Sequence, residues 1–239
     1  MLNRAMEELR IPTLSALQIE DVDRRQQAQQ REWAANLPAG RLVEFYGRKL
    51  AIYAGVFPPK HDTQLLARAM QIARGNCVAD IGTGTGALAI RAADQGAATV
   101  LAIDICDAAV ENAKENVRRA NLESRVTVRK GNVFDAVPTE AAFDVVIANL
   151  PGRNKVAAND VATAHWDTEF KAHHLLFQQV GNHLAPSGRL YMVKANYPEL
   201  NDAIDLACAH GLKPRIAARQ KAPGDDPRTY YVLEFVQSA

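Results

Sequence analysis

The stretch Cys77-Val78-Ala79-Asp80-Ile81-Gly82-Thr83-Gly84-Thr85-Gly86 decides the fold. Its first half is a short, mostly apolar run of the length typical of a buried strand. Its second half alternates glycine with threonine, and glycine allows the backbone to turn tightly and to approach a ligand closely. The stretch therefore predicts a strand that turns into a helix, with a ligand bound at the turn.

The chain on either side of this turn alternates between short apolar runs and longer stretches of helix-forming residues. Because such runs occur where helices cover both faces of a sheet, they predict an α/β fold with a doubly wound, mostly parallel sheet. Asp62 or Thr63 is expected to cap the first of the helices. The predicted strands cover residues 77–81, 99–104, 126–130, 143–149, 189–193 and 229–236, and the predicted helices residues 61–74, 87–95, 107–121, 170–184 and 200–210.

Residues 1–40 differ in composition from the rest of the chain. Residues 21–33 are polar and free of glycine and proline, which predicts a helical N-terminal extension that ends near Pro38-Ala39-Gly40. The main domain is expected over residues 41–239, beginning with a hairpin around Gly47. A helix that is polar on most faces needs a partner surface. Packing on the domain edge is favoured, and a homodimer through these helices or a contact with substrate are the alternatives.

Composition and charge exclude several classes of protein. The 239 residues include 28 basic and 27 acidic ones, and this net charge of +1 excludes a nucleic-acid binder that works by bulk positive charge. No apolar run approaches the roughly 20 residues of a membrane span, and the N-terminus has no apolar segment typical of a secretory signal. The cysteines are far apart and match no zinc motif. A cytoplasmic protein without a metal site or membrane association is therefore expected.

Two acidic residues indicate which ligand the turn binds. Gly82, Gly84 and Ala87 satisfy the dinucleotide pattern GxGxxG/A. Asp80, however, would lie in the mouth of the loop, where a carboxylate repels pyrophosphate and attracts the ammonium group of an amino acid, which favours S-adenosylmethionine. Asp104 ends the next strand and is placed to accept hydrogen bonds from both ribose hydroxyls, each worth about 1.5–3 kcal/mol. Asp104 alone would fit NAD equally well.

The segment Asn132-Val133-Phe134-Asp135 follows the third strand and is the candidate for adenine recognition. Asp135 or the Asn132 amide would bind the adenine amino group, with Val133 or Phe134 against the ring. An ordinary polar turn is an equally good interpretation. The expected cofactor-binding residues are Asp80, Gly82, Thr83, Gly84, Gly86, Asp104, Ile105, Asn132, Val133 and Asn149.

The segment Asn149-Leu150-Pro151-Gly152 ends the fourth strand, at the edge where ligands bind in open α/β sheets. The side-chain carbonyl of Asn149 and the backbone carbonyl of Leu150 can accept hydrogen bonds from a planar NH2 group. That arrangement would fix a nitrogen for in-line attack on a methyl sulfonium, so that catalysis comes from placement at near-attack distance. Asn149, Leu150 and Pro151 are therefore the expected catalytic residues.

In order along the chain, these motifs resemble the class I S-adenosylmethionine-dependent methyltransferases, and the similarity runs from about Leu42 to Val236. Within that class, residues 55–66 resemble the lead-in GVFxPRxET of the HemK-like branch, which includes the release-factor glutamine methyltransferases. Residues 149–152 resemble its acceptor motif NPPY. The resemblance implies a Rossmann-like, seven-stranded sheet whose last strand is antiparallel. It also implies that Asn149 and Pro151 bind the acceptor nitrogen.

The chain departs from that branch at four positions. Leu150 gives the NLP form found in some RNA methyltransferases, and Gly152 removes the aromatic that stacks on the substrate. Lys60 and Asp62 stand at the arginine and glutamate of the lead-in. A glutamine in a tripeptide motif is therefore no longer the obvious acceptor, and an aromatic would have to come from elsewhere. The candidates are Trp166, Tyr46 and Phe45.

Residues 153–171 form a long polar segment past the acceptor motif, where a substrate lid would lie. His165 is a candidate general base within it, although a histidine beside a tryptophan is more often structural. The expected substrate-binding residues are Tyr46, Gly152, His165 and Trp166.

The sequence thus predicts a methyltransferase that uses S-adenosylmethionine to methylate an amine or amide nitrogen on a small molecule or a protein side chain. An RNA base methyltransferase is an alternative, although nucleic acid is not favoured. A non-catalytic cofactor-binding subunit that activates a partner is a second alternative, and a nicotinamide-dependent oxidoreductase is a third. The sequence leaves open the acceptor, the atom methylated and the oligomeric state.

Overall fold

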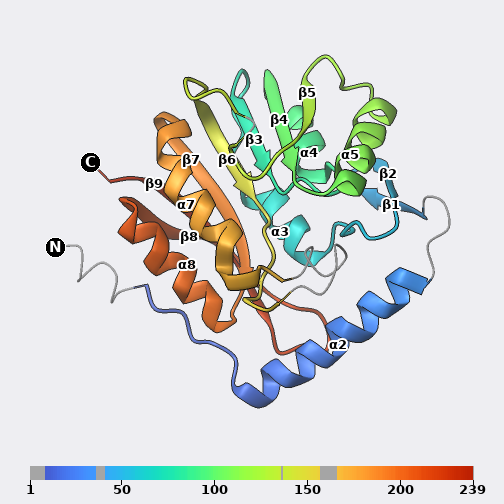
Figure 1. Cartoon of the computed structure of the whole chain (residues 1–239), viewed down its shortest axis with the longest axis vertical. Coiled ribbons are helices and arrows are strands. Elements are labelled where there is room, and N and C mark those ends of the chain that lie inside the picture. Colours follow the sequence, from blue (N-terminus) through green and yellow to red (C-terminus); the bar gives the residue numbers. More distant parts are fainter. Residues whose placement is uncertain (1–8, 36–40, 136, 157–165, 239) are drawn as a thin grey trace.

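The computed structural model describes residues 9–35, 41–135, 137–156 and 166–238. Its centre is a seven-stranded sheet in the order β5-β4-β3-β6-β7-β9-β8 (Figure 1). Neighbouring strands from β5 to β7 pair in parallel, and β9 is antiparallel to both β7 and β8. The predicted fold, including the antiparallel last strand, is confirmed. The strands are β3 (Cys77–Ile81), β4 (Thr99–Asp104), β5 (Val126–Lys130), β6 (Phe143–Ala148), β7 (Leu184–Ala195), β8 (Leu212–Lys221) and β9 (Thr229–Gln237).

Helices cover both faces of the sheet. Successive residues of a strand point to opposite faces, and in the central strands both sets are apolar. Along β6, Val146 and Ala148 pack into the core beneath α7 and α8, and Val145 and Ile147 pack into the core beneath α3, α4 and α5. Figure 1 shows these two layers on opposite sides of the strands. The helices are α3 (His61–Ala69), α4 (Ala87–Gln95), α5 (Asp107–Arg119), α7 (Lys171–His183), which follows the short helix η1 (Thr168–Phe170), and α8 (Pro198–Ala209).

The sequence did not locate β8, and it misplaced the end and the cap of α3. β8 lies at the edge of the sheet with an exposed, basic sequence that contains Pro214, so it lacks the apolar run that marks the central strands. α3 ends at Ala69 instead of Arg74. The cap prediction is wrong, because Lys60 occupies the N-cap position and the Thr63 hydroxyl accepts the Lys60 backbone N–H at 3.4 Å.

The N-terminal helix α2 (Ala16–Ala35) lies at the bottom of the view in Figure 1, outside the two helical layers. Leu14 and Val22 are buried against Ala195 and Tyr197, and the Leu14 backbone N–H donates to Asn196 O at 2.9 Å. After residues 36–40, which lie outside the described residues, the predicted hairpin forms as β1 (Arg41–Phe45) and β2 (Arg48–Ile52). The domain boundary at residue 40 therefore stays a prediction.

In the described part of the chain, no helix is both long enough and apolar enough to span a bilayer.

Candidate active site

The glycine loop between β3 and α4 has a backbone that favours glycine. Gly82, Gly84 and Gly86 all have positive φ angles, of 70°, 55° and 78°. A Cβ atom on Gly82 would lie 3.0 Å from the Cδ2 atom of Leu150 in the acceptor motif. The lack of a side chain therefore allows the loop and the acceptor motif to approach each other closely, as the sequence predicted for a ligand-binding turn.

Asp104, at the end of β4, is tied to this loop. One of its carboxylate oxygens accepts the Gly84 backbone N–H at 2.9 Å, and the other accepts the Cys106 backbone N–H at 3.0 Å. Burial raises the pKa of Asp104. Each carboxylate oxygen can accept more than one hydrogen bond, so both retain capacity for ribose hydroxyls. Ile105 follows with 59% of its surface exposed, and both residues line the cavity described below.

Asp80 lies beneath the loop and not in its mouth, which corrects the predicted position. Its side chain accepts the Thr83 hydroxyl at 2.7 Å and the Ala89 backbone N–H at 3.1 Å. The residue is only 1% exposed, and burial raises the pKa of its carboxyl to about 7. Its other oxygen, Oδ1, has no hydrogen-bond partner among the described residues. Asp80 therefore shapes the turn from behind, since Thr83 and Ala89 hold the carboxylate there.

The segment after β5 divides into residues that face the cavity and residues that do not. Asn132 and Val133 line the cavity, and Val133 has a φ of 54°, which is unusual for a β-branched residue. Phe134 is buried and stacks on His183, with ring centroids 4.5 Å apart. Asp135 accepts a hydrogen bond from Gln179 at 3.3 Å. Of the alternatives for adenine, the structure therefore brings Asn132 and Val133 to the site.

A cavity of about 500 Å³ lies between the glycine loop and the acceptor motif. Tyr46 is not part of its wall, because its hydroxyl donates to Gln64 O at 3.2 Å and its ring faces the Arg91 guanidinium at 4.5 Å. This corrects the prediction that Tyr46 contacts substrate. Phe45 is buried in the core, and His165 lies outside the described residues. The predicted site residues that line the cavity are Gly82, Thr83, Gly84, Asp104, Ile105, Asn132, Val133, Asn149, Leu150, Pro151, Gly152 and Trp166.

The Asn149 side chain is oriented by the first turn of α3. Its Nδ2 atom donates to Thr63 Oγ1 at 3.1 Å and to Asp62 Oδ2 at 3.5 Å. Because an ionised carboxylate only accepts hydrogen bonds, Asp62 fixes which end of the amide is the nitrogen. The Asn149 carbonyl oxygen is therefore available as an acceptor at the cavity wall.

Sequence reasoning missed the residues that line the cavity beyond the acceptor motif. They come from α2, β7, β9 and the segments beside these strands, and no local motif marks them, because distant segments meet only in the folded chain. Among them, Gln26 belongs to the helix that the sequence placed at the domain edge. These residues include Gln26, Lys194, Tyr197, Arg228 and Tyr230.

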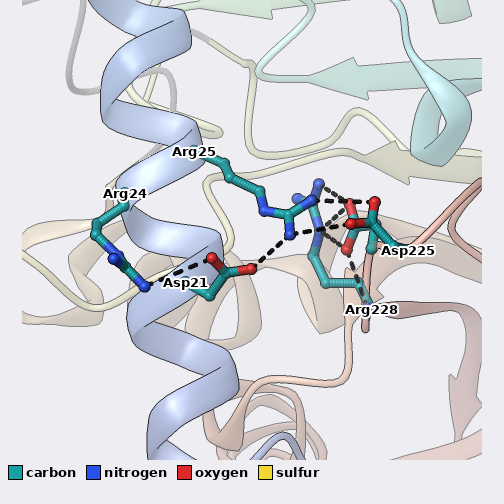
Figure 2. A network of polar contacts seen from close by, with 6 residues as sticks. Asp21, Arg24, Arg25, Asp225 and Arg228 are labelled. Carbon is teal, nitrogen blue, oxygen red and sulfur yellow. Dashed lines mark hydrogen bonds and ion pairs between the residues drawn. The ribbon is translucent and has the colours of Figure 1, made fainter.

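Ion pairs attach α2 to the loop before β9. Figure 2 shows Arg25 between Asp21 of its own helix, at 2.8 Å, and Asp225 of that loop, at 3.3 Å. In the same loop Arg228 pairs with Asp226 at 2.5 Å and lines the cavity. α2 is therefore part of the surroundings of the site.

Comparisons with known proteins agree with this arrangement. The model of the family "Methyltransferase small domain" matches residues 49–210. The ribosomal protein L11 methyltransferase of Desulforamulus reducens is 51% identical over 76 residues, which are 32% of this chain and 24% of that protein. A putative protein N5-glutamine methyltransferase of Methanocaldococcus jannaschii is 26% identical over 77% of this chain and 95% of that protein.

Solved structures show the same fold. The crystal structure of ribosomal protein L11 methylase from Lactobacillus delbrueckii subsp. bulgaricus superposes with a TM-score of 0.61 at 22% identity, and covers 87% of this chain and 93% of that one. The family match spans more than half of the sequence and contains the glycine loop, Asp104 and Asn149. The chain therefore belongs to the methyltransferase small domain family, and the S-adenosylmethionine-dependent methyltransferase predicted from its sequence is confirmed at the level of that family.

Proposed function

We propose that this protein transfers a methyl group from S-adenosylmethionine to an amide or amine nitrogen of a protein side chain. The observation that carries the proposal is the fixed Asn149 amide. Its nitrogen donates to Asp62 and Thr63, so its carbonyl oxygen is left to accept an N–H of the acceptor. A planar NH2 group has two N–H donors, one for the Asn149 carbonyl and one for the backbone carbonyl of Leu150, whereas a hydroxyl acceptor has a single proton to donate.

The cofactor supplies an electrophilic methyl group when it is bound. The residues proposed to hold it are those of the glycine loop, Asp104, Ile105, Asn132 and Val133, all of which line the cavity apart from Gly86. Asn149 and the backbone carbonyl of Leu150 would orient the acceptor nitrogen. Such placement converts methyl transfer into an effectively unimolecular step, which accounts for a large part of the rate enhancement.

Aromatic side chains are proposed to replace the one that Gly152 lacks. A Cβ atom on Gly152 would meet nothing within 4 Å, so the motif leaves open space at this point. Trp166, Tyr197 and Tyr230 line the same cavity. A planar amide can pack against such rings, as it would against the missing aromatic.

The relatives favour a protein acceptor over a small molecule or an RNA base. They are named for ribosomal protein L11 and for protein glutamine. The chain spans only about a quarter of the L11 methyltransferase and 62% of the release factor glutamine methyltransferase of Cereibacter sphaeroides. A release factor and ribosomal protein L11 are accordingly the first acceptors to test.

Transfer of labelled methyl groups tests this function. S-adenosylmethionine labelled in the methyl group is incubated with the protein and a cell extract, and protein, RNA and small molecules are then separated. We expect label in the protein fraction with the wild type and with Asn154→Ala, an exposed asparagine outside the cavity wall. Asn149→Ala should lose the label and still bind the cofactor. Label in RNA or in small molecules, or label that survives Asn149→Ala, would overturn the proposal.

A further inference from the structure

A buried lysine lies beside the acceptor motif. Lys194 is only 2% exposed, lines the cavity and stands near the end of β7. Ala148, just before Asn149, pairs with Met192 across the two strands, so Lys194 lies next to the motif. Its Nζ atom donates to the backbone carbonyl of Pro151 at 3.2 Å. Because burying an ammonium group costs free energy, a buried lysine needs hydrogen-bond partners or nearby charges that offset this cost.

Lys194 continues into a chain of hydrogen bonds through α7. Its Nζ atom lies 2.7 Å from Nε2 of His173, and Nδ1 of His173 lies 2.6 Å from Oδ2 of Asp167. Asp167 also accepts the backbone N–H groups of Ala172 and His173, which with the His173 ring lower its pKa in spite of burial. An ionised Asp167 only accepts, so Nδ1 of His173 carries the proton and Nε2 presents a lone pair to Lys194.

The histidine ring has no freedom to turn away from the lysine. Phe170 stacks on His173 with ring centroids 3.9 Å apart and planes within 1° of parallel. His173 is fully buried, and burial together with the nearby Lys194 lowers its pKa to about 3. His173 is therefore neutral near pH 7 and acts as a fixed acceptor for the lysine.

Burial and the charged groups around Lys194 together bring the pKa of its amine close to physiological pH. Burial lowers the pKa of Lys194 to about 7, although the carboxylates of Glu199, Asp167 and Asp202 raise it. The charge of Glu199 is shared with Arg153, whose Nε atom lies 3.0 Å away. A large fraction of Lys194 is therefore an uncharged amine at physiological pH.

An uncharged Lys194 has one lone pair to offer. A neutral amine carries two N–H groups, and the structure provides two acceptors for them, His173 Nε2 and Pro151 O. No further hydrogen bond of Nζ is made within the described part of the chain, and the residue forms part of the cavity wall with Asn149. The acceptor nitrogen proposed above would be held at this wall.

We propose that Lys194 is a catalytic base of the methyl transfer, positioned by His173 and Asp167. This role rests on the proposed function. The nitrogen–carbon bond forms as the carbon–sulfur bond breaks, and the electron pair of the broken bond stays on sulfur. The methylated nitrogen, now positively charged, gives its proton to the lone pair of Lys194. The resulting ammonium group releases that proton to solvent when product leaves.

The pH dependence of turnover in variants of Lys194 tests this role. With the acceptor protein found by labelling, kcat of the wild type should rise with pH through about 7. We expect Lys194→Ala to lower kcat by about 10²–10⁴-fold and to lose this rise of kcat with pH, as removal of a general base does. Added methylamine or ethylamine should restore part of the activity, because a free amine can occupy the space left by the side chain. Lys213→Met, on the exposed edge strand β8, is the matched control and should leave kcat unchanged.

A second readout needs no turnover. In protein labelled with ¹³C-lysine, the resonance assigned by its loss in Lys194→Ala should titrate near pH 7. Asp167→Asn removes a carboxylate that raises the pKa of Lys194. The titration of Lys194 and the rise of kcat with pH should therefore both move to lower pH. A Lys194 that titrates near its ordinary pKa of about 10.4, or a Lys194→Ala variant with kcat within about threefold of wild type, would overturn the base role. Neither result would touch the proposed function, which is tested separately by the fraction that the wild type labels and by the loss of label in Asn149→Ala.

Discussion

The Nδ2 atom of Asn149 lies 3.1 Å from the Oγ1 atom of Thr63, although 86 positions separate these residues in the sequence. Thr63 is buried, with 4% of its surface exposed, and stands in the first turn of α3. The contact joins the lead-in segment, residues 55–66, to the acceptor motif after β6. Each of these two motifs resembles the same family in sequence. In the structure they form one unit that orients the Asn149 amide.

Removing the Thr63 hydroxyl should weaken catalysis without loss of the cofactor. Thr63→Val keeps the shape of the side chain and removes the hydrogen bond from Asn149, worth roughly 1 kcal/mol, together with the longer bond from the Lys60 backbone N–H. We expect kcat for methyl transfer to fall about 5–10-fold with the Kd of S-adenosylmethionine unchanged. Thr127→Val, at an exposed position of β5, is the control and should leave both unchanged. Equal kcat for the two variants would show that Thr63 does not orient Asn149.

Adding a methyl group to Gly82 should impair both folding and cofactor binding. Gly82→Ala places Cβ 3.0 Å from Leu150 in a backbone with φ of 70°. Gly47→Ala has a similar φ of 77° but meets nothing within 4 Å, so it carries the backbone strain alone, about 1–2 kcal/mol. Urea unfolding should show the larger loss for Gly82→Ala, and calorimetry should show weaker binding of S-adenosylmethionine for that variant only. Unchanged affinity in Gly82→Ala would contradict the assignment of the loop.

The buried Asp80 carboxyl should make stability fall as pH rises. Its pKa is about 7 in the folded chain against 3.8 for the free group, so the folded state retains a proton that the unfolded state releases between these values. Over that window the wild type should lose up to about 4 kcal/mol relative to Asp80→Asn, which does not titrate. Urea unfolding of both proteins at about pH 4.5 and about pH 8 measures the difference. A difference independent of pH would mean that Asp80 ionises normally.

Two aspartates on one helix should differ in their contribution to stability. Asp23 pairs with the buried Arg153 at 2.6 Å, next to the acceptor motif, whereas Asp21 pairs with the exposed Arg24 and Arg25 (Figure 2). Asp23→Asn removes a charged hydrogen-bond acceptor of a buried guanidinium and should lower the free energy of unfolding by about 1–3 kcal/mol. Asp21→Asn should change it by less than about 1 kcal/mol. Equal effects on urea unfolding would contradict the attachment of α2 through Arg153.

Much of the fold could be predicted because its central strands are short and apolar. β3, β4 and β6 are covered on both faces, so each leaves a run that stands out in the sequence. β8 is the counterexample: it has one neighbour, carries basic residues and was recognised only in the structure. β5, at the other edge, keeps apolar Val126 and Val128 and was predicted, whereas the mostly exposed, basic β8 lacks such a signal, as is common in strands that avoid further pairing.

The candidate site divides in the same way. Asp104 and Asn149 could be found because each lies at the end of a strand, where a parallel sheet collects its ligands. Tyr46 was wrongly placed, since its position depends on how the β1–β2 hairpin packs and not on its neighbours in sequence. Lys194 and His173 gave no signal, because 21 positions separate them and only tertiary packing brings them together.

The chemical form of the transferred methyl group tests the central claim most directly. Protein labelled by the wild-type chain is hydrolysed to completion, and the labelled product is identified. We predict label in methylamine, released from a methylated side-chain amide, or in an N-methylated amino acid, released from a methylated amine. Label recovered as methanol would mean an ester on oxygen and would contradict the role of Asn149 as the holder of a nitrogen acceptor.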